Sequence, residues 1–283
     1  MTEILNFSAD TLEKPIKIKE YFTKELGFST SLLTKVKTSG VFINGIPVHM
    51  RATLNPRDKI TVYLPKEKSE GITPIDIPIS VIYEDEHILA VNKPIGMPTH
   101  PSRGNSLPTL AEAVMNYYGS DFVFRAVSRL DKDTSGIVLI AKNAYASALL
   151  GRAMKNGEIE KEYIAVIKGV PKEPHGIIEA PIERLCEGNV KRGVIQDGKY
   201  AKTEYEVLSI TEDENSVIRV KLHTGRTHQI RVHMSYIGHP LLGDSLYGDF
   251  PKTDTYKLHC HRISFNFLSR SVSLSCIPDF YAP

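Results

Sequence analysis

The spacing of apolar residues in the first part of the chain predicts two short helices followed by a small sheet. Residues 17–26 place apolar side chains at helical spacing, and a second helix follows with Ser29 or Thr30 as its cap. Residues 41–48 form two apolar runs around an Asn-Gly pair, which is typical of a hairpin. Residues 59–64 alternate as a further strand. These elements predict a compact module with a small core.

A change of composition separates this module from the rest of the chain. Residues 66–79 are charged at first and then contain Pro and Gly without any hydrophobic period, which is typical of a linker. The apolar pattern resumes near Ser80. We therefore expect two domains, 1–65 and 80–283, joined by this linker.

Strand-like and helical runs follow one another through the second domain, and no internal repeat is visible. A Thr-x-x-Glu capping box at 109–112 opens one helix. The short, unbroken apolar run at 137–141 is typical of a strand buried on both faces. The expected strands lie within 79–93, 137–141, 161–169 and 201–224, and the expected helices within 109–119, 143–157 and 230–237.

Composition indicates an ordinary globular protein, since 41% of the 283 residues are hydrophobic and 24% are charged. The formal net charge is only +2, so a nucleic-acid partner would have to be met by local basic patches.

The three cysteines, Cys186, Cys260 and Cys276, lie far apart, which indicates neither a zinc site nor a disulfide framework. Neither a signal peptide nor an apolar run of the ~18 residues that span a bilayer is evident. We therefore expect a cytoplasmic protein with no membrane partner.

Candidate chemistry concentrates in the turn that precedes the buried strand, SRLDKDTSG at 128–136. Asp131 would be held there in a fixed place by a rigid scaffold. Ordinary turn chemistry explains Asp, Thr, Ser and Gly equally well. A calcium loop is rejected because Lys142 stands where a bidentate Glu is required. The spacing also resembles the D-x-D-x-T motif of the aspartate-nucleophile phosphatases, but its fifth residue is Ser135.

The same segment closely resembles the HRLD-x-x-TSG signature of the RluA-type pseudouridine synthases, with Asp131 at the position of the catalytic aspartate. Ser128 stands where that family usually has His, which puts local packing or an RNA contact in doubt. The loop 92–105 (NKPIGMPTHPSRGN) also resembles a recurrent loop of these enzymes.

The resemblance implies roles for further residues. Arg231, in GRTHQIRVH, matches the arginine that pairs with the aspartate, and Tyr163, in KEYIAVIKG, matches the tyrosine that lies against the uracil. Arg129 matches the arginine that enters the RNA where the target base leaves the stack. Arg226, in the same motif as Arg231, is assigned with Arg129 to RNA binding. Taken alone, Arg231 would be a surface helix residue and Tyr163 a core tyrosine at a strand start.

The N-terminal module resembles, more loosely, the alpha-L RNA-binding domain. The match consists of the helix pair, then SGVFINGIPV and an Asp before the last strand, while Arg57 stands where Gly usually precedes Asp58. Lys35 and Lys37 are candidate phosphate-binding residues, although a merely solvated basic face remains an alternative.

These resemblances imply an α+β fold, with a mixed, largely antiparallel central sheet flanked by helices and a small N-terminal RNA-binding domain. They imply an isomerase that converts uridines of structured RNA to pseudouridine with one aspartate and with neither cofactor nor metal. We expect ribosomal RNA rather than transfer RNA as the partner, and a monomer. A non-catalytic RNA-binding protein and a metal-dependent phosphohydrolase are the alternatives.

Overall fold

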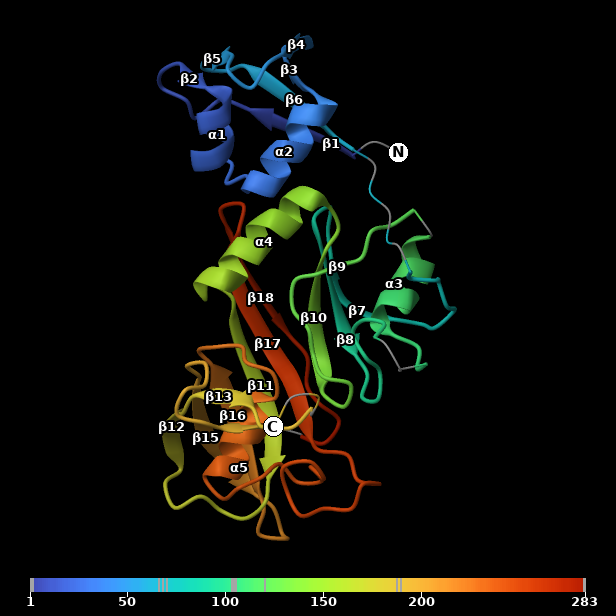
Figure 1. Ribbon diagram of the computed structural model, residues 1–283, viewed down its shortest axis with the longest axis vertical. Helices are drawn as coiled ribbons and strands as arrows, with labels where there is room; N and C mark the ends of the chain where they lie inside the picture. Colours follow the sequence, from blue (N-terminus) through green and yellow to red (C-terminus); the bar gives the residue numbers. More distant parts are fainter. Residues whose placement is uncertain are drawn as a thin grey trace.

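The computed structural model describes residues 3–65, 67, 69, 71–102, 106–119, 121–186, 188 and 190–281. It contains a small N-terminal unit, residues 3–64, and a larger unit built on one long sheet (Figure 1). The N-terminal unit lies at one end of the long axis of the molecule, next to helix α4 of the larger unit (Figure 1).

The N-terminal unit is a four-stranded sheet in the order β1-β6-β3-β4, covered by two helices. All three pairings in this sheet are antiparallel. Its elements are β1 (Glu3–Ser8), β2 (Ile16–Lys17), α1 (Ile18–Lys24), α2 (Thr30–Ser39), β3 (Val41–Ile43), β4 (Ile46–Val48), β5 (Thr53–Leu54) and β6 (Lys59–Leu64).

Local sequence explains how this unit folds. The side chain of Ser29 caps α2 by accepting a hydrogen bond from the backbone N–H of Leu32 at 3.2 Å. Asn44 and Gly45 both have positive φ, as the tight turn between β3 and β4 requires. The cap and the hairpin agree with the sequence prediction, whereas β1 was not predicted.

The larger unit is organised around a sheet in the order β12-β15-β16-β11-β17-β10-β8-β7, with β18 on β17 and β9 on β10. The hairpin of β13 and β14 lies outside this sheet. The strands are β7 (Ser80–Glu84), β8 (Ile88–Lys93), β9 (Arg125–Ala126), β10 (Ser135–Ala141), β11 (Glu160–Ile167), β12 (His175–Glu179), β13 (Ile182–Arg184), β14 (Arg192–Val194), β15 (Lys202–Ile210), β16 (Ser216–Leu222), β17 (Leu258–Phe267) and β18 (Arg270–Ser275).

Among the strand pairs of the described residues, only β10 and β17 run parallel, and their register joins Ser135 to His259 and Gly136 to Cys260. Gly136 has φ +106°, and a Cβ there would lie 2.4 Å from the carbonyl oxygen of Cys260. Glycine is therefore required at the point where the turn carrying Asp131 enters the sheet. The fold is the mixed, largely antiparallel α+β architecture that the family resemblance implied.

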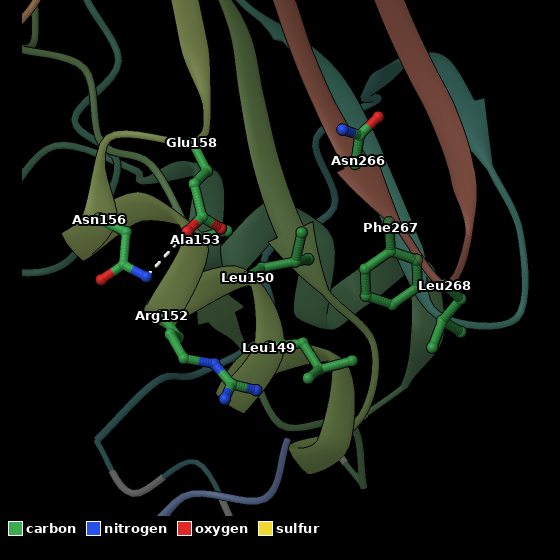
Figure 2. Close-up of a pocket in the computed structure, with 9 residues that line it drawn as sticks. All are labelled: Leu149, Leu150, Arg152, Ala153, Asn156, Glu158, Asn266, Phe267 and Leu268. Atoms are coloured by element: carbon green, nitrogen blue, oxygen red, sulfur yellow. Dashed lines mark hydrogen bonds between the residues drawn. The ribbon is translucent and has the colours of Figure 1, made fainter. Parts of the chain in front are cut away.

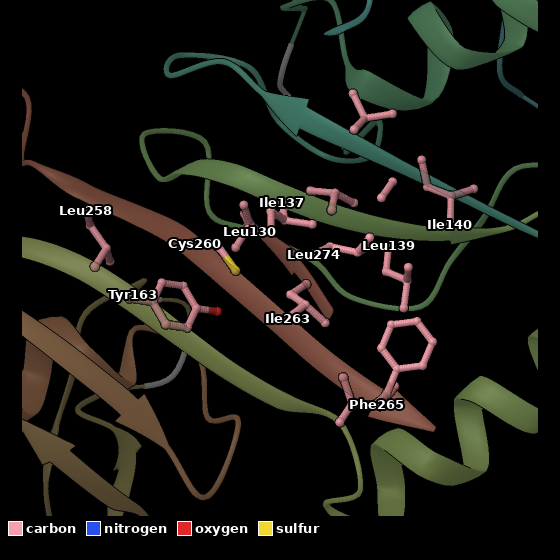
Figure 3. Close-up of a cluster of buried hydrophobic side chains, with 14 of the residues drawn as sticks. Leu130, Ile137, Leu139, Ile140, Tyr163, Leu258, Cys260, Ile263, Phe265 and Leu274 are labelled. Carbon is pink, nitrogen blue, oxygen red and sulfur yellow. The ribbon is translucent and has the colours of Figure 1, made fainter. Parts of the chain in front are cut away.

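Three helices accompany the sheet: α3 (Leu110–Tyr118), α4 (Ala144–Asn156) and α5 (Gln229–Tyr236). The predicted capping box is present at the start of α3, and Asn143 caps α4. The apolar faces of all three helices join the main core, which includes β10 and β17 (Figure 3). Among the described residues, no helix has the length and apolar character needed to cross a bilayer.

The N-terminal unit packs on α4. The ring of Tyr145 lies 5.2 Å from that of Phe7 and 5.3 Å from that of Phe28, centroid to centroid. The guanidinium of Arg152 also donates a hydrogen bond to the carbonyl of Gly27 at 2.5 Å. Because α5 lies near the other end of the large sheet (Figure 1), this contact is remote from the site described next.

Candidate active site

Asp131 lies in the turn between β9 and β10, as its motif predicted. The carbonyl of Asp131 accepts a hydrogen bond from the backbone N–H of Thr134 at 3.1 Å. Its side chain is 34% exposed, so a substrate can reach the carboxylate. Thr99 fixes the preceding residue, because its hydroxyl donates to the carbonyl of Leu130 and accepts from the N–H of the same residue.

A buried lysine, Lys93, holds the other side of this turn. Its ammonium donates to the carbonyls of Pro94, Met97 and Lys132 at 2.7–3.1 Å. Burial lowers the pKa of Lys93 to about 8, although the carboxylates of Asp133 and Asp131 oppose that change. The lysine thereby ties the loop after β8 to the residue that follows Asp131.

Arg231 of α5 faces the carboxylate of Asp131, with 4.0 Å between Nη1 and Oδ2. Its other nitrogens, Nε and Nη2, donate to the two carboxylate oxygens of the fully buried Asp244 at 2.7 and 2.8 Å. Taken alone, Arg231 would be a surface helix residue, but the residue is only 7% exposed because most of α5 is buried. Such a bidentate pair is a strong, directional contact.

Two tyrosine rings enclose the Arg231 guanidinium, whose central carbon lies 4.9 Å from the centre of the Tyr247 ring and 4.3 Å from that of Tyr256. Burial alone would lower the pKa of Arg231, but the hydrogen bonds to Asp244 and the nearby negative charges raise it above its usual value. Arg231 is thus a fixed cation whose Nη1 is directed at Asp131.

His228 completes this side of the site. Its Nε2 lies 3.8 Å from the Asp131 carboxylate, and its Nδ1 is hydrogen-bonded to the hydroxyl of Tyr247 at 2.7 Å. Burial lowers the pKa of His228, and the charge of Arg231 adds to this effect while Asp131 opposes it. His228 is therefore a hydrogen-bonding histidine.

Tyr163 of β11 is almost fully buried and points toward Cys260 of the neighbouring β17 (Figure 3). Burial and then the Cys260 thiol raise the pKa of Tyr163 well above its usual value, and Asp131 acts in the same direction. The phenol is therefore neutral, and Tyr163 lies within electrostatic reach of Asp131.

The two cleft arginines expected to bind RNA are exposed. Arg129 precedes Asp131 by two residues, and its charge contributes, after burial, to the lowered pKa of His100. Arg226 lies in the turn before α5 and donates through Nε to the carbonyl of Tyr200 at 2.9 Å. Residues 103–105 of the predicted loop 92–105 lie outside the described residues.

The two N-terminal lysines expected to bind phosphate differ from each other. Lys35 of α2 forms an ion pair with Glu67, which also pairs with Arg125 at 2.7 Å. Lys37 of the same helix is exposed. Helix α2, which carries both lysines, lies at the end of the molecule away from α5 (Figure 1).

Ser128, which replaces the usual histidine, is buried, and its hydroxyl accepts a hydrogen bond from the backbone N–H of Leu139 at 3.0 Å. The serine therefore supports the pairing of the turn with β10. The structure gives it a packing role.

A hollow elsewhere on the surface lies between α4 and the turn that joins β17 to β18 (Figure 2). Leu149, Arg152 and Phe267 are among its lining residues, and Asn156 donates to Glu158 across its rim at 2.8 Å. Neither Asp131 nor Arg231 lines this hollow, so it is separate from the site around these two residues.

Sequence reasoning missed several residues of the cleft: Lys93, His228, Asp244, Tyr247 and Tyr256. The sequence held one signal of Asp244. An arginine beside the buried apolar face of a helix needs a carboxylate partner, and Asp244 follows Arg231 shortly in the sequence. The position of Lys93 at the end of an apolar strand was a second signal, because it places a charged side chain next to the core. A partly exposed carboxylate beside a fixed cation can act as a nucleophile or a base, with neutral aromatic groups to hold a ring.

Fold and site together give an α+β protein in which a partly exposed carboxylate faces a fixed cation. Residues 87–236 match the family model described as RNA pseudouridylate synthase. The chain belongs to this family, and it is an enzyme that isomerises uridine in RNA. Family membership decides against the phosphohydrolase alternative.

Curated relatives agree with this assignment. The RNA pseudouridine synthase YjbO of Bacillus subtilis is 40% identical, with 88% of this chain and 89% of the relative covered. The ribosomal large subunit pseudouridine synthase D of Zymomonas mobilis is 40% identical over 68% of this chain and 62% of its own. The solved structure of human RNA pseudouridylate synthase domain containing 1 is 29% identical, with a TM-score of 0.62 over 73% of this chain and 85% of that chain.

Proposed function

We propose that Asp131 is the reacting carboxylate of this uridine isomerase. Pseudouridine formation breaks the bond from uracil N1 to ribose C1′ and rejoins the base through C5, so substrate and product contain the same atoms. A carboxylate that stays ionised beside the sugar is what this chemistry needs. The observation that carries the proposal is the position of the partly exposed Asp131, 4.0 Å from an Arg231 that Asp244 and two tyrosine rings hold in place.

The neighbouring residues take complementary roles. Arg231 places a fixed positive charge beside the Asp131 carboxylate. Tyr163 lies against the uracil, and an aromatic face holds any base without reading its sequence. Arg129 fills the stack after the target uridine leaves it, which offsets part of the cost of extrusion, a few kcal/mol.

The substrate in this proposal is ribosomal RNA of the large subunit. Two features support it: the likeness to ribosomal large subunit pseudouridine synthases, and the helix pair and small sheet of the N-terminal unit. Residues 1–65 act as an RNA-binding domain, 66–79 as a linker and 80–283 as the catalytic domain. The exposed Lys37 of the N-terminal unit and the exposed Arg226, in the turn before α5, contact phosphates. The protein acts as a cytoplasmic monomer.

Release of tritium from RNA labelled at uridine C5 tests the substrate, since the C5 hydrogen leaves when the base rejoins through that carbon. In vitro transcripts of large-subunit ribosomal RNA and of a transfer RNA pool are compared, with and without EDTA. We expect release from the ribosomal transcript that EDTA does not reduce. Release from transfer RNA alone would overturn the proposed substrate, and RNA binding without any release would favour the non-catalytic alternative.

A further inference from the structure

A further arginine lies beside the site, on an element outside the central sheet. Arg192 opens β14 of the β13–β14 hairpin, which packs through Ile182 and Val194 against Val232 of α5 and against Tyr247. The hairpin therefore approaches the site from the side of α5.

The backbone of Arg192 joins a hydrogen-bond chain that ends at His228, next to the reacting carboxylate. Its N–H donates to the hydroxyl of Tyr247 at 3.0 Å, and that hydroxyl is bonded to Nδ1 of His228. His228 Nε2 lies 3.8 Å from Asp131. The charge of Arg192 also contributes to the lowered pKa of His228, after burial and Arg231.

The guanidinium of Arg192 is poorly satisfied in the free protein. Its Nε is the buried side-chain polar atom without a hydrogen-bond partner in the part of the chain that the structure describes. Its Nη1 lies 3.8 Å from the carboxylate of Glu183, a distance too long for a hydrogen bond. Arg231 differs in having both Nε and Nη2 bonded to Asp244. A buried donor left without an acceptor disfavours the conformation that holds it.

We propose that Arg192 is a substrate-binding residue whose guanidinium turns into the cleft and binds a backbone phosphate next to the target uridine. The inference rests on the proposed function and adds a subsite to it. An extruded uridine brings its flanking phosphates to the mouth of the cleft. The planar fork of an arginine matches a phosphate and would give Nε an acceptor. Arg231 is not available for this contact, because Asp244 holds it.

The test measures RNA affinity separately from catalysis. Each variant is made in the full chain, in a background with Asp131→Asn for binding and with intact Asp131 for tritium release. The probe is the large-subunit ribosomal transcript, and binding is measured across a series of NaCl concentrations. Failure of the proposed substrate would appear as no release from the parent protein. Failure of this inference would appear in the Arg192 variant while the parent protein still releases tritium.

For Arg192→Gln we expect the Kd and KM to rise about tenfold while kcat stays within about twofold, because a phosphate contact acts in the ground state and the transition state alike. The slope of log Kd against log salt should become shallower by about 0.7–0.9, the value of one lost phosphate contact. A fall in kcat with unchanged KM and salt slope would overturn the proposal.

Arg219→Gln is the matched control. It removes the same charge from β16, where Arg219 is exposed and pairs with Glu206. Its Kd and salt slope should stay near those of the parent, and equal effects of the two substitutions would contradict a specific subsite.

If Arg192→Gln does not fold, as judged by circular dichroism, Arg192→Lys takes its place. Lysine keeps the charge but cannot make the paired contact of a guanidinium. The salt slope should then stay at the parent value while the Kd rises about threefold. An unchanged Kd would overturn the proposal.

Discussion

The cleft and the N-terminal unit hold their basic side chains in different ways. Arg231 in the cleft is buried, bonded twice to Asp244 and enclosed by two tyrosine rings. Lys37 on α2 is exposed, and Lys35 is paired with an acidic residue of the segment that follows the unit. Chemistry at one atom needs a cation in a fixed place, whereas docking on a phosphate backbone needs only charge at the right distance. The effects of substitutions in the two regions should therefore differ in magnitude and in the property that changes.

Asp244→Asn should have the largest effect on stability. It leaves the Arg231 guanidinium buried without its compensating charge, and breaking such a pair costs about 3–5 kcal/mol. Thermal or urea unfolding measures this cost. Glu206→Gln breaks the partly exposed pair with Arg219 and should cost less than about 1 kcal/mol. Equal losses for the two variants would show that Asp244 does not act as the partner that fixes Arg231.

Lys93→Met should come next, with a loss of about 2–4 kcal/mol at neutral pH, because three buried carbonyls lose their donor. The pKa of Lys93 is lowered to about 8 in the folded state, so the unfolded chain binds more protons above that pH. The stability contributed by this group therefore increases as pH rises through 8 toward its usual pKa, and it is lost as pH falls through 8.

This pH dependence gives the lysine prediction a second readout. Methionine cannot titrate, so the stability gap between the parent and Lys93→Met should widen between pH 7 and pH 10, in urea unfolding at each pH. A gap that stays constant or narrows would contradict the buried, hydrogen-bonded state of Lys93. Lys132→Met, which removes an exposed ammonium from the same turn, is the control and should show no such widening.

The smallest effects should come from the N-terminal unit. Lys37→Gln should raise the Kd for ribosomal RNA about two- to threefold and leave kcat unchanged, since the loss is one exposed phosphate contact. Lys35→Gln should change the Kd less, because Glu67 already neutralises that charge. Filter binding at several salt concentrations measures the Kd of each variant and so distinguishes the two effects. A larger fall in kcat than in affinity would place these lysines in the chemistry instead.

Much of the fold was visible in the sequence because local signals and packing agree there. The run at 137–141 became the buried core of β10, and the caps of α2, α3 and α4 lie where the sequence placed them. The strands β17 and β18 were not predicted, although β17 is central. Polar residues interrupt its apolar run, and its neighbours β10 and β11 come from distant segments, so its burial follows from tertiary pairing alone.

The site residues divide in the same way, into those that the sequence indicated and those that only the structure shows. The motifs indicated Asp131, Arg231 and Tyr163, and the structure brings the first two within 4.0 Å of each other. The residues that fix them, such as Asp244 and Tyr256, come from a long Gly- and Pro-containing stretch before β17. Such a stretch has no hydrophobic period, so only the folded chain shows which of its side chains are buried against Arg231.

The central claim, that Asp131 carries the reaction, is tested most directly by tritium release from C5-labelled ribosomal RNA with Asp131→Asn and Asp133→Asn. Both changes remove one carboxylate charge from the same turn, and only Asp131 faces Arg231. We expect release by Asp131→Asn to fall by at least about 10³-fold, equivalent to ~4 kcal/mol of barrier, with RNA still bound. Release by Asp133→Asn should stay within about fivefold of the parent. Undiminished release by Asp131→Asn, or equal losses in the two variants, would contradict the account.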